Sequence, residues 1–316
     1  MKQTRREFVR TLFVATQATV FGSVLPRSLL ADDAKAGGPN FVALGDWGRN
    51  GEKDQRDVAK QMGMAADETK SRFVLAVGDN FYEDGVASVD DPQWQTSFEK
   101  VYTAPSLQVP WHAVLGNHDY HLNADAQIAY GKVSKRWTMP ARYYKRTEPV
   151  DAATSVDFFF IDTMPMAVFD DDEAQYDHKV PRHDVPNQMA WLESSLAAST
   201  APWKIVVGHH PVFSGGGHGD TPFLVEHVQP LLEKHKVQAY INGHDHDLQH
   251  LQSGGVNFFC SGGGSKPRTT KNSAQTKFAM GCSGFMAVAM QADKMNVRMI
   301  DDRGNLLYTV AVPRVS

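Results

Sequence analysis

The stretch RFVLAVGDNFY, residues 72–82, is the clearest example of the pattern that decides the fold of this chain. Its apolar and β-branched residues predict a buried strand, and Gly78-Asp79 predicts a loop directly after it. Asp79 and Tyr82 would therefore lie at the carboxyl end of a strand, the edge at which an α/β sheet collects its functional loops. Four further segments repeat this arrangement.

Each of these four segments also follows an apolar run that predicts a strand. They are Gly45-Asp46-Trp47-Gly48, Gly116-Asn117-His118-Asp119, Gly208-His209-His210 and Gly243-His244-Asp245-His246. One such segment carries little weight, because Gly-Asp is common in turns and a single histidine is commonly a packed or surface residue. Five segments in order, each after a strand, indicate one shared site.

The five loops together offer carboxylate, phenol, amide and imidazole groups, all of which bind metal ions. The candidate ligands are Asp46, Asp79, Tyr82, Asn117, His209, His244 and His246. Oxygen and nitrogen donors suit hard or borderline cations, and a shared carboxylate can bridge two of them. Two cations about 3.5–4 Å apart can hold both the attacking and the leaving oxygens of a phosphoryl transfer. The pattern therefore predicts a dinuclear metal site.

The order of the predicted elements favours an α/β fold in which two packed mixed sheets are flanked by helices. Strands are predicted at residues 41–44, 72–77, 111–115, 154–161, 203–207, 237–241, 248–252, 256–260, 285–290, 295–300 and 306–312. Helices are predicted at residues 54–69, 91–102, 124–136, 187–198 and 221–235, with long loops at 164–186 and 261–279. Because the ligand segments extend from Asp46 to His246, we expect a single domain over residues 37–316.

The first 36 residues have the features of a twin-arginine signal peptide. The pair Arg5-Arg6 precedes a mildly apolar run that is too short to span a membrane, and Ala34-Lys35-Ala36 offers a cleavage site. An amphipathic N-terminal helix is the alternative interpretation. We expect the twin-arginine export machinery to deliver the protein to the periplasm or the exterior, with no membrane attachment after cleavage.

Composition and charge exclude some partners. Of the 316 residues, 42% are hydrophobic and 22% are charged, as is usual for a soluble globular protein. Cleavage after Ala36 would remove six of the 32 basic residues and three of the 36 acidic ones, which gives a formal charge near −7. That balance argues against a general nucleic-acid or anionic-membrane surface. Cys260 and Cys282 could form a disulfide or remain free thiols, and thiolate metal chemistry is not indicated.

The motifs resemble those of the calcineurin-like metallophosphoesterases and, within them, of the purple acid phosphatases. Many of the former have a histidine two residues after the first aspartate, where this chain has Gly48. Tyr82 instead matches the tyrosine that binds ferric iron in purple acid phosphatases. Residues 78–86 and 126–144 are similar to the small, tartrate-resistant branch. The resemblance covers about residues 41–251 and implies a four-layer αββα sandwich.

This resemblance also implies a cofactor and a set of roles. The cofactor would be a dinuclear centre of Fe(III) with Fe(II), Zn(II) or Mn(II). Asp46, Tyr82 and His246 would hold the ferric ion, Asp79 would bridge, and Asn117, His209 and His244 would hold the divalent ion. His118 would contact the phosphate or protonate the leaving alkoxide, and His218 would be a second substrate-facing histidine. A metal-bound hydroxide would attack phosphorus directly, without a phosphoenzyme.

Several assignments keep an alternative. Tyr82 could be a packed aromatic side chain, and His118 could be structural. The glycine-rich loop around His218 differs from the family. Trp47 could wall the pocket or cover the metal site. Five further histidines are interpreted as structural or surface residues, namely His112, His121, His178, His183 and His210. His178 and His183, beside the acidic run 170–173, could instead form an adventitious metal patch.

We therefore expect a monomeric acid phosphatase that acts on small phosphomonoesters. A phosphodiesterase or nucleotidase with the same metals is one alternative, which the width of the pocket would separate. A non-catalytic metal- or phosphate-binding protein is another. His118 argues against the second alternative, because binding alone has no need of a proton donor.

Overall fold

The computed structural model of this chain describes residues 37–169 and 180–315. The predicted signal peptide, the acidic run 170–173 and His178 lie outside the described residues. His183 lies in a short 3-10 turn, Arg182–Asp184. Within the described ranges, no helix is both long enough and apolar enough to cross a membrane.

The described residues form two mixed sheets of seven strands each. In spatial order, the first sheet contains β14 (Leu306–Pro313), β13 (Lys294–Asp301), β12 (Gly284–Met290), β1 (Phe41–Leu44), β2 (Phe73–Val77), β3 (Trp111–Val114) and β4 (Trp137–Thr138). The second contains β11 (Thr276–Met280), β9 (Leu248–Ser253), β10 (Val256–Ser261), β8 (Ala239–Asn242), β7 (Trp203–Val207), β6 (Ser155–Phe160) and β5 (Tyr144–Pro149). Strands β1 to β4 run parallel in the first sheet, as do β6, β7, β8 and β10 in the second.

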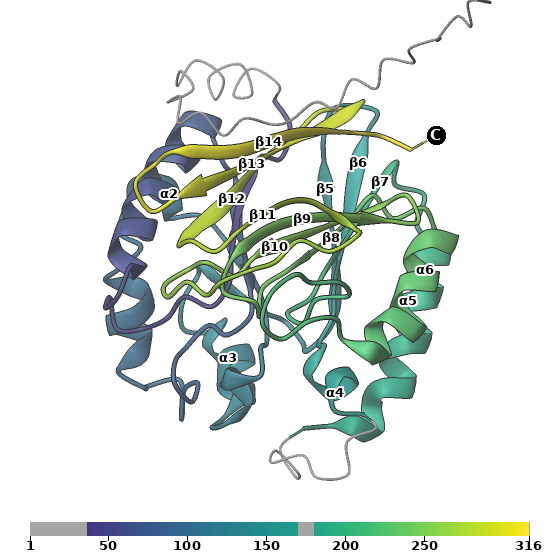
Figure 1. Cartoon of the computed structure of the whole chain (residues 1–316). Coiled ribbons are helices and arrows are strands. Elements are labelled where there is room, and N and C mark those ends of the chain that lie inside the picture. Colours follow the sequence, from purple (N-terminus) through teal and green to yellow (C-terminus); the bar gives the residue numbers. More distant parts are fainter. Residues whose placement is uncertain (1–36, 170–179, 316) are drawn as a thin grey trace, which may run out of the picture.

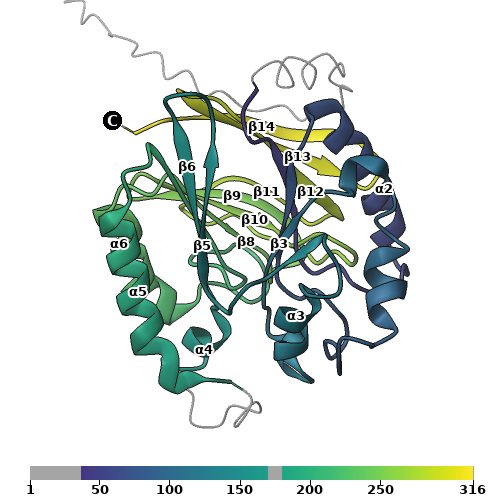
Figure 2. The same cartoon turned by 180° about the vertical axis from the view of Figure 1, so that it is seen from behind.

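Helices cover the outer face of each sheet (Figures 1 and 2). Helix α2 (Gln55–Thr69) lies beside the first sheet, whereas α5 (Val185–Ala198) and α6 (Gln229–Lys234) lie beside the second. The resulting order of layers is helix, sheet, sheet, helix, which confirms the predicted αββα sandwich. The short helices α3 (Ala124–Tyr130) and α4 (Met164–Ala167) lie at the same end of the molecule, α3 on the side of the first sheet and α4 on the side of the second (Figures 1 and 2).

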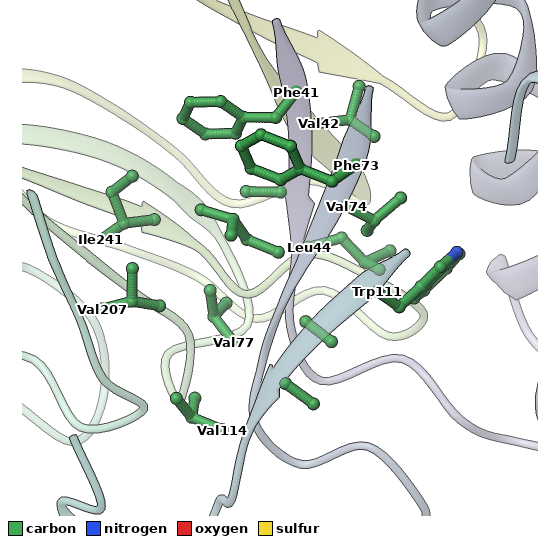
Figure 3. Close-up of a cluster of buried hydrophobic side chains, with 14 of the residues drawn as sticks. Phe41, Val42, Leu44, Phe73, Val74, Val77, Trp111, Val114, Val207 and Ile241 are labelled. Atoms are coloured by element: carbon green, nitrogen blue, oxygen red, sulfur yellow. The ribbon is translucent and has the colours of Figure 1, made fainter. Parts of the chain in front are cut away.

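The space between the sheets is filled by apolar side chains from both of them. Figure 3 shows Phe41 and Phe73 of the first sheet directed toward Val207 and Ile241 of the second, while Val74 points to the opposite face. All five are 2% exposed or less. Successive side chains of a strand point to opposite faces, so an apolar residue at every position lets each strand pack against two layers.

Strand β6 shows the same principle in the second sheet. The Phe158 ring meets Phe41 and Phe73 edge-on between the sheets, with centroid distances of 5.6 and 5.5 Å. The neighbouring Phe159 faces outward and belongs to the apolar cluster that includes Leu192 of α5 and Leu232 of α6. A continuous apolar run therefore indicates a strand that is covered on both faces.

Some predicted element boundaries are wrong. Residues 91–102 form a π-helix only over Trp94–Glu99, and the helix predicted at 124–136 ends at Tyr130. The helix predicted at 221–235 is confirmed as one uninterrupted helical run over residues 222–234, in which a π-helix, Leu224–Val228, passes directly into α6. Pro230 lies inside this run without ending it, although it has no N–H to donate. The loop predicted at 164–186 contains α4.

Strands β4, β5 and β11 are absent from the prediction, and β11 begins inside the predicted loop 261–279. Strand β4 lies at an edge of the first sheet, and β5 and β11 lie at the two edges of the second. Strand β5, with the sequence YKRTEP, has an exposed Lys145 on one face and a half-buried Arg146 paired with the buried Glu148 on the other, so its apolar pattern is weak.

Candidate metal centre

The predicted ligand loops meet at one edge of the molecule, where parallel strands of both sheets end. The loops after β1, β2 and β3 come from the first sheet, and those after β7 and β8 come from the second. Gly78 permits their close approach, because a Cβ at this position would lie 2.5 Å from Nδ1 of His209. Its φ of 89° is also a conformation that favours glycine.

Asp46, Tyr82 and His246 form the first donor group. The phenol oxygen of Tyr82 lies 2.9 Å from Asp46 Oδ1 and 3.1 Å from His246 Nε2. Potential ligand atoms of Asp46, Asp79 and His246 all lie within 4.8 Å of one another, and these three residues are buried. Three side chains that could bind a metal therefore surround one point.

Asn117, His209 and His244 form the second donor group. The Asn117 Oδ1 atom lies 3.2 Å from His209 Nε2 and 3.0 Å from His244 Nδ1. These two imidazole nitrogens are 3.2 Å from each other. One amide oxygen and two ring nitrogens thus converge at a second point.

Asp79 lies between the two groups and directs one carboxylate oxygen to each. Its Oδ2 accepts a hydrogen bond of 2.8 Å from the Tyr82 hydroxyl. Its Oδ1 lies 3.5 Å from His209 Nε2 and accepts a 2.9 Å bond from the His118 backbone N–H. This is the arrangement that a bridging carboxylate requires.

Backbone carbonyls orient two of the histidines. His209 Nδ1 lies 2.9 Å from the carbonyl oxygen of Val77, and His246 Nδ1 lies 2.8 Å from that of Lys266. A carbonyl oxygen only accepts, so Nδ1 carries the proton in both rings. The lone pair of each Nε2 consequently faces its donor group, as in histidines that bind metals.

Burial and neighbouring charges shift the pKa values of two candidate ligands, Tyr82 and His209. Burial raises the pKa of Tyr82, the carboxylates of Asp46 and Asp79 raise it further, and the Arg49 guanidinium acts in the opposite direction. Burial disfavours protonated His209, but Asp79 and Asp46 outweigh it and raise the pKa of this histidine. In the protein alone, protons thus compensate the carboxylates, and a bound cation would displace them.

These residues fit a dinuclear metal centre. All their donor atoms are oxygen or nitrogen, which suits hard and borderline cations, and each donor group shares Asp79. The first group contains a phenol and a second carboxylate, whereas the second contains a neutral amide and two imidazoles. The two positions therefore differ in the anionic charge that they offer.

Three of the candidate ligands have a left-handed backbone conformation. The φ angles are 62° at Asp46, 48° at Asp79 and 72° at His244. This conformation costs a residue other than glycine about 1–2 kcal/mol. Hydrogen bonds between the loops oppose that cost, such as the 2.9 Å bond from the His244 N–H to Asp46 Oδ2. The site therefore stores backbone strain.

His118 lies above the first donor group, with its ring centroid 4.5 Å from that of Tyr82. Its Nδ1 lies 2.5 Å from the carbonyl oxygen of Glu83, which can only accept, so this nitrogen carries a proton. The other nitrogen, Nε2, lies 4.0 Å from Asp79 Oδ2 and faces the site. The side chain is 23% exposed, so a substrate can reach it.

His218 lies beside the second donor group, with its ring centroid 4.3 Å from that of His244. Arg268 donates to its Nε2 at 2.5 Å. The sequence did not indicate Arg268 as a site residue. The structure places it at the site, because its backbone N–H donates to the backbone carbonyl oxygen of His246 at 2.8 Å. The beginning of the loop predicted at 261–279 is thus part of the site.

Asp119, the last residue of the Gly116–Asp119 motif, has no role that the sequence predicts, and it joins two of the ligand loops. It is fully buried, and its carboxylate accepts hydrogen bonds from the backbone N–H groups of Gly116, Asn80 and Phe81. Burial and the nearby charge of Asp79 raise its pKa to about 7. The loops after β2 and β3 are held together by this side chain.

Trp47, His210 and the two cysteines, which the sequence analysis considered, belong to neither donor group. Trp47 is fully buried in the core, where its ring packs against Phe81 and Trp111, so it does not form a wall of the site. His210 is buried behind His244, with 4.4 Å between their ring centroids. The two cysteines are free thiols, Cys260 and Cys282.

Comparisons with known proteins identify the family of this chain. A family model described as calcineurin-like phosphoesterase matches residues 39–248. Purple acid phosphatase 7 of Arabidopsis thaliana is 40% identical over 294 residues, which cover 89% of this chain and 88% of that protein. Tartrate-resistant acid phosphatase type 5 of Sus scrofa is 37% identical over 294 residues, or 87% of this chain and 86% of that protein.

Solved structures share the fold. GAP50, described as the anchor in the inner membrane complex of Plasmodium, matches with a TM-score of 0.79 and 25% identity over 88% of this chain and 89% of its own. A purple acid phosphatase from yellow lupin (Lupinus luteus) matches with a TM-score of 0.65 and 18% identity over 89% of this chain and 55% of its own. From the family model and the relatives of 37–40% identity, we conclude that this chain belongs to the calcineurin-like phosphoesterases and, within them, to the purple acid phosphatases.

Proposed function

We propose that this protein is an exported, monomeric acid phosphatase that hydrolyses small phosphomonoesters at a dinuclear centre of Fe(III) and a divalent Fe, Zn or Mn ion. The observation that carries the proposal is Asp79, whose two oxygens face different donor groups. The relatives named above support the acid phosphatase activity by their similarity to this chain.

The difference in charge between the donor groups supports the assignment of the metals. Asp46, Tyr82 and His246 would hold the ferric ion, because a phenolate and a carboxylate compensate a higher charge. Asn117, His209 and His244 would hold the divalent ion. When bound, the metals supply Lewis acidity to the phosphate and acidify water.

Besides the metal ligands, the proposed mechanism uses His118, which would protonate the leaving oxygen. Its proton on Nδ1 is held by the Glu83 carbonyl oxygen, so Nε2 is the nitrogen that can exchange a proton with a substrate. Because Nε2 faces the site and the ring is partly exposed, an ester oxygen can approach it. Positioned acids of this kind accelerate reactions about 10²–10⁴-fold.

Arg268 and His218, beside the second donor group, would bind the phosphate of the substrate. Arg268 carries a fixed positive charge, and its contact with His218 holds the two side chains together at the site. Guanidinium groups bind phosphate oxygens in a bidentate manner. We assign Arg268 and His218 to the non-bridging oxygens of the substrate.

The export proposal has its own test. Replacing Arg5 and Arg6 together by lysine should retain the precursor in the cytoplasm, because twin-arginine export depends on this pair. Cell fractionation and the mass of the mature N-terminus measure this outcome. Normal export and processing of the double variant would contradict the proposed pathway.

A non-catalytic role is the second candidate, and the similarity to GAP50 gives a reason to test it, because that protein is described as an anchor. The complete set of donor groups and the partly exposed His118 favour catalysis. A protein that binds metal and phosphate but has no turnover would identify the non-catalytic role.

The deciding experiment compares p-nitrophenyl phosphate with bis-p-nitrophenyl phosphate as substrates of the purified, metal-loaded protein from acid to alkaline pH. We expect faster hydrolysis of the monoester, with a maximum below neutral pH. A preference for the diester, or an alkaline maximum, would favour the phosphodiesterase alternative. Asp79→Asn should abolish turnover of both esters, since it removes the shared carboxylate.

A further inference from the structure

Arg49 lies outside the proposed ligand set, yet its guanidinium group covers the ring of Tyr82. The guanidinium carbon is 3.6 Å from the ring centroid, well inside the ~6 Å range of a cation–π interaction. The Arg49 side chain is only 9% exposed. A buried cation therefore lies directly on the aromatic side chain of the first donor group.

Hydrogen bonds fix Arg49 in this position. Its Nε donates to Ser265 Oγ at 3.0 Å, and its Nη1 donates to Glu83 Oε1 at 2.6 Å. The Ser265 hydroxyl in turn donates to the Asp46 backbone oxygen at 2.6 Å. Arg49 is thus connected directly to Glu83 and, through Ser265, to Asp46. These hydrogen bonds fix the orientation of the guanidinium over the ring.

Arg49 is buried, but its carboxylate partner, Glu83, is not. The Glu83 side chain is 70% exposed, so water screens its attraction to the guanidinium. The face of the Tyr82 ring is a second negative surface in contact with the guanidinium. The ring would gain most from this cation when it is rich in electrons, as a phenolate is.

The phenol oxygen lies where negative charge is already dense. It is 2.9 Å from Asp46 Oδ1 and 2.8 Å from Asp79 Oδ2. The positive charge of Arg49 over the face of the ring offsets part of this repulsion without occupying a ligand position. Arg49 is therefore suited to stabilise Tyr82 in the form that binds a metal.

We propose that Arg49 is a positioning residue that stabilises the electron-rich Tyr82 ring and thereby sets the energy of its charge-transfer absorption with ferric iron. This inference rests on the proposed role of Tyr82 as a ligand. A cation on the ring lowers the energy of the ring's electrons, so more energy is needed to transfer one to the metal. The same positive charge favours the reduced form of the iron.

The test is the visible absorption spectrum of the iron-loaded protein with Arg49→Met, Arg49→Lys and Glu83→Gln substitutions. We expect the absorption maximum to move to longer wavelength in Arg49→Met and less far in Arg49→Lys, which keeps the charge but not the planar group. Glu83→Gln should move it to shorter wavelength, because it removes the competing carboxylate. The midpoint potential of the iron should fall in Arg49→Met.

Arg136→Met is the matched control, because the Arg136 guanidinium lies 4.3 Å from the centroid of the Phe98 ring, which is not a ligand. It should leave the absorption maximum unchanged. Circular dichroism and iron content per chain verify that each variant is folded and loaded. An unchanged maximum in folded, loaded Arg49→Met would overturn the inference and leave the proposed function intact.

Tyr82→Phe separates the two proposals. If the iron-loaded wild type has a visible band that Tyr82→Phe loses, Tyr82 is a ligand and the Arg49 variants test the inference directly. Absence of such a band in the iron-loaded wild type would overturn both the ligand role of Tyr82 and the inference on Arg49.

Discussion

At the scale of single residues, the orientation of His118 leads to a test of its proposed role as an acid. We expect His118→Asn to lower kcat by about 10²–10³ for an alkyl phosphate and by much less for p-nitrophenyl phosphate. The reason is that p-nitrophenolate leaves without a proton, whereas an alkoxide needs one. The two substrates are compared at saturating concentration with the metal content verified.

His121→Asn is the control for this prediction. The His121 ring lies 5.1 Å from that of His118, but its Nδ1 is paired with Asp84 at 3.0 Å and has no proposed part in catalysis. Equal losses of kcat for both substrates in His118→Asn would contradict the acid role and indicate a structural one.

A second residue, His112 in β3, makes the fold sensitive to acid. Its side chain is fully buried between Phe73 and Phe160, and within the described part of the chain neither ring nitrogen has a hydrogen-bond partner. Burial, together with the charge of Arg146, lowers its pKa to about 3. Below pH 6.5 the unfolded chain therefore binds a proton that the folded protein does not, so stability falls as the pH falls.

Replacing His112 should reduce the loss of folding stability at acid pH. Between pH 6.5 and pH 5 the buried imidazole costs about 2 kcal/mol, at ~1.4 kcal/mol per pH unit. We expect metal-free His112→Phe to lose less stability than the wild type over this range, as measured by urea unfolding at both pH values. His227→Gln is the control, since His227 is exposed on the π-helix before α6. An identical acid sensitivity of wild type and His112→Phe would refute the explanation.

At the scale of elements, the end of α2 offers a simple gain in stability. Lys70 caps this helix in the left-handed conformation, with φ 53° and ψ 48°. Glycine adopts this conformation without the steric cost of a Cβ, so Lys70→Gly should stabilise the protein by about 1 kcal/mol. Lys60→Gly, at an exposed position inside the same helix, should destabilise it by about 1 kcal/mol. Urea unfolding of both variants checks the opposite signs.

The strand-to-loop units were the part of the fold that local sequence could predict. An apolar run followed by Gly78-Asp79 contains both the strand and its turn within a few residues, and the same is true of Gly243-His244. Some helix ends were predicted less well, such as the end of α3 at Tyr130, because they depend on packing partners elsewhere in the chain. Edge strands such as β5 bury one face only, so their pattern resembles a loop.

The contacts between distant segments could not be predicted in the same way. The motif residues are adjacent to the strands that place them, whereas Arg268 reaches His218 across 50 positions of the chain. Arg49 follows the first motif directly, but nothing in the sequence indicates that its side chain lies on Tyr82. A search for basic residues near the motifs would have found Arg49 as a candidate without giving it a role.

At the scale of the whole molecule, the site joins the two sheets. Asp46, Asp79 and Asn117 come from loops of the first sheet, whereas His209 and His244 come from loops of the second. A metal bound by both sets is present only when the sheets are packed together. Binding should therefore stabilise the complete fold by mass action, by about 3–4 kcal/mol at 100–1,000 times the dissociation constant.

This coupling can be measured by thermal unfolding with and without a chelator. We expect metal removal to lower the unfolding temperature of the wild type. Asn117→Ala in one sheet and His209→Ala in the other should each reduce that difference. As a control, Lys277→Ala replaces an exposed residue of β11 and should preserve it. A chelator effect that survives both ligand substitutions would show that the stabilising metal lies elsewhere.

The left-handed backbone at Asp46, Asp79 and His244 also has an evolutionary consequence. At these positions glycine would relieve the strain, while only a side chain with a donor atom supports the site. With metal bound, these side chains stabilise the fold by more than their strain costs, so selection for stability and selection for catalysis act in the same direction. In a lineage that no longer binds metal, the strain would remain without that compensation, and these positions would be free to drift toward glycine. Consensus or library-based engineering of this protein should keep the three positions fixed, because glycine would relieve the strain but remove the donor atoms.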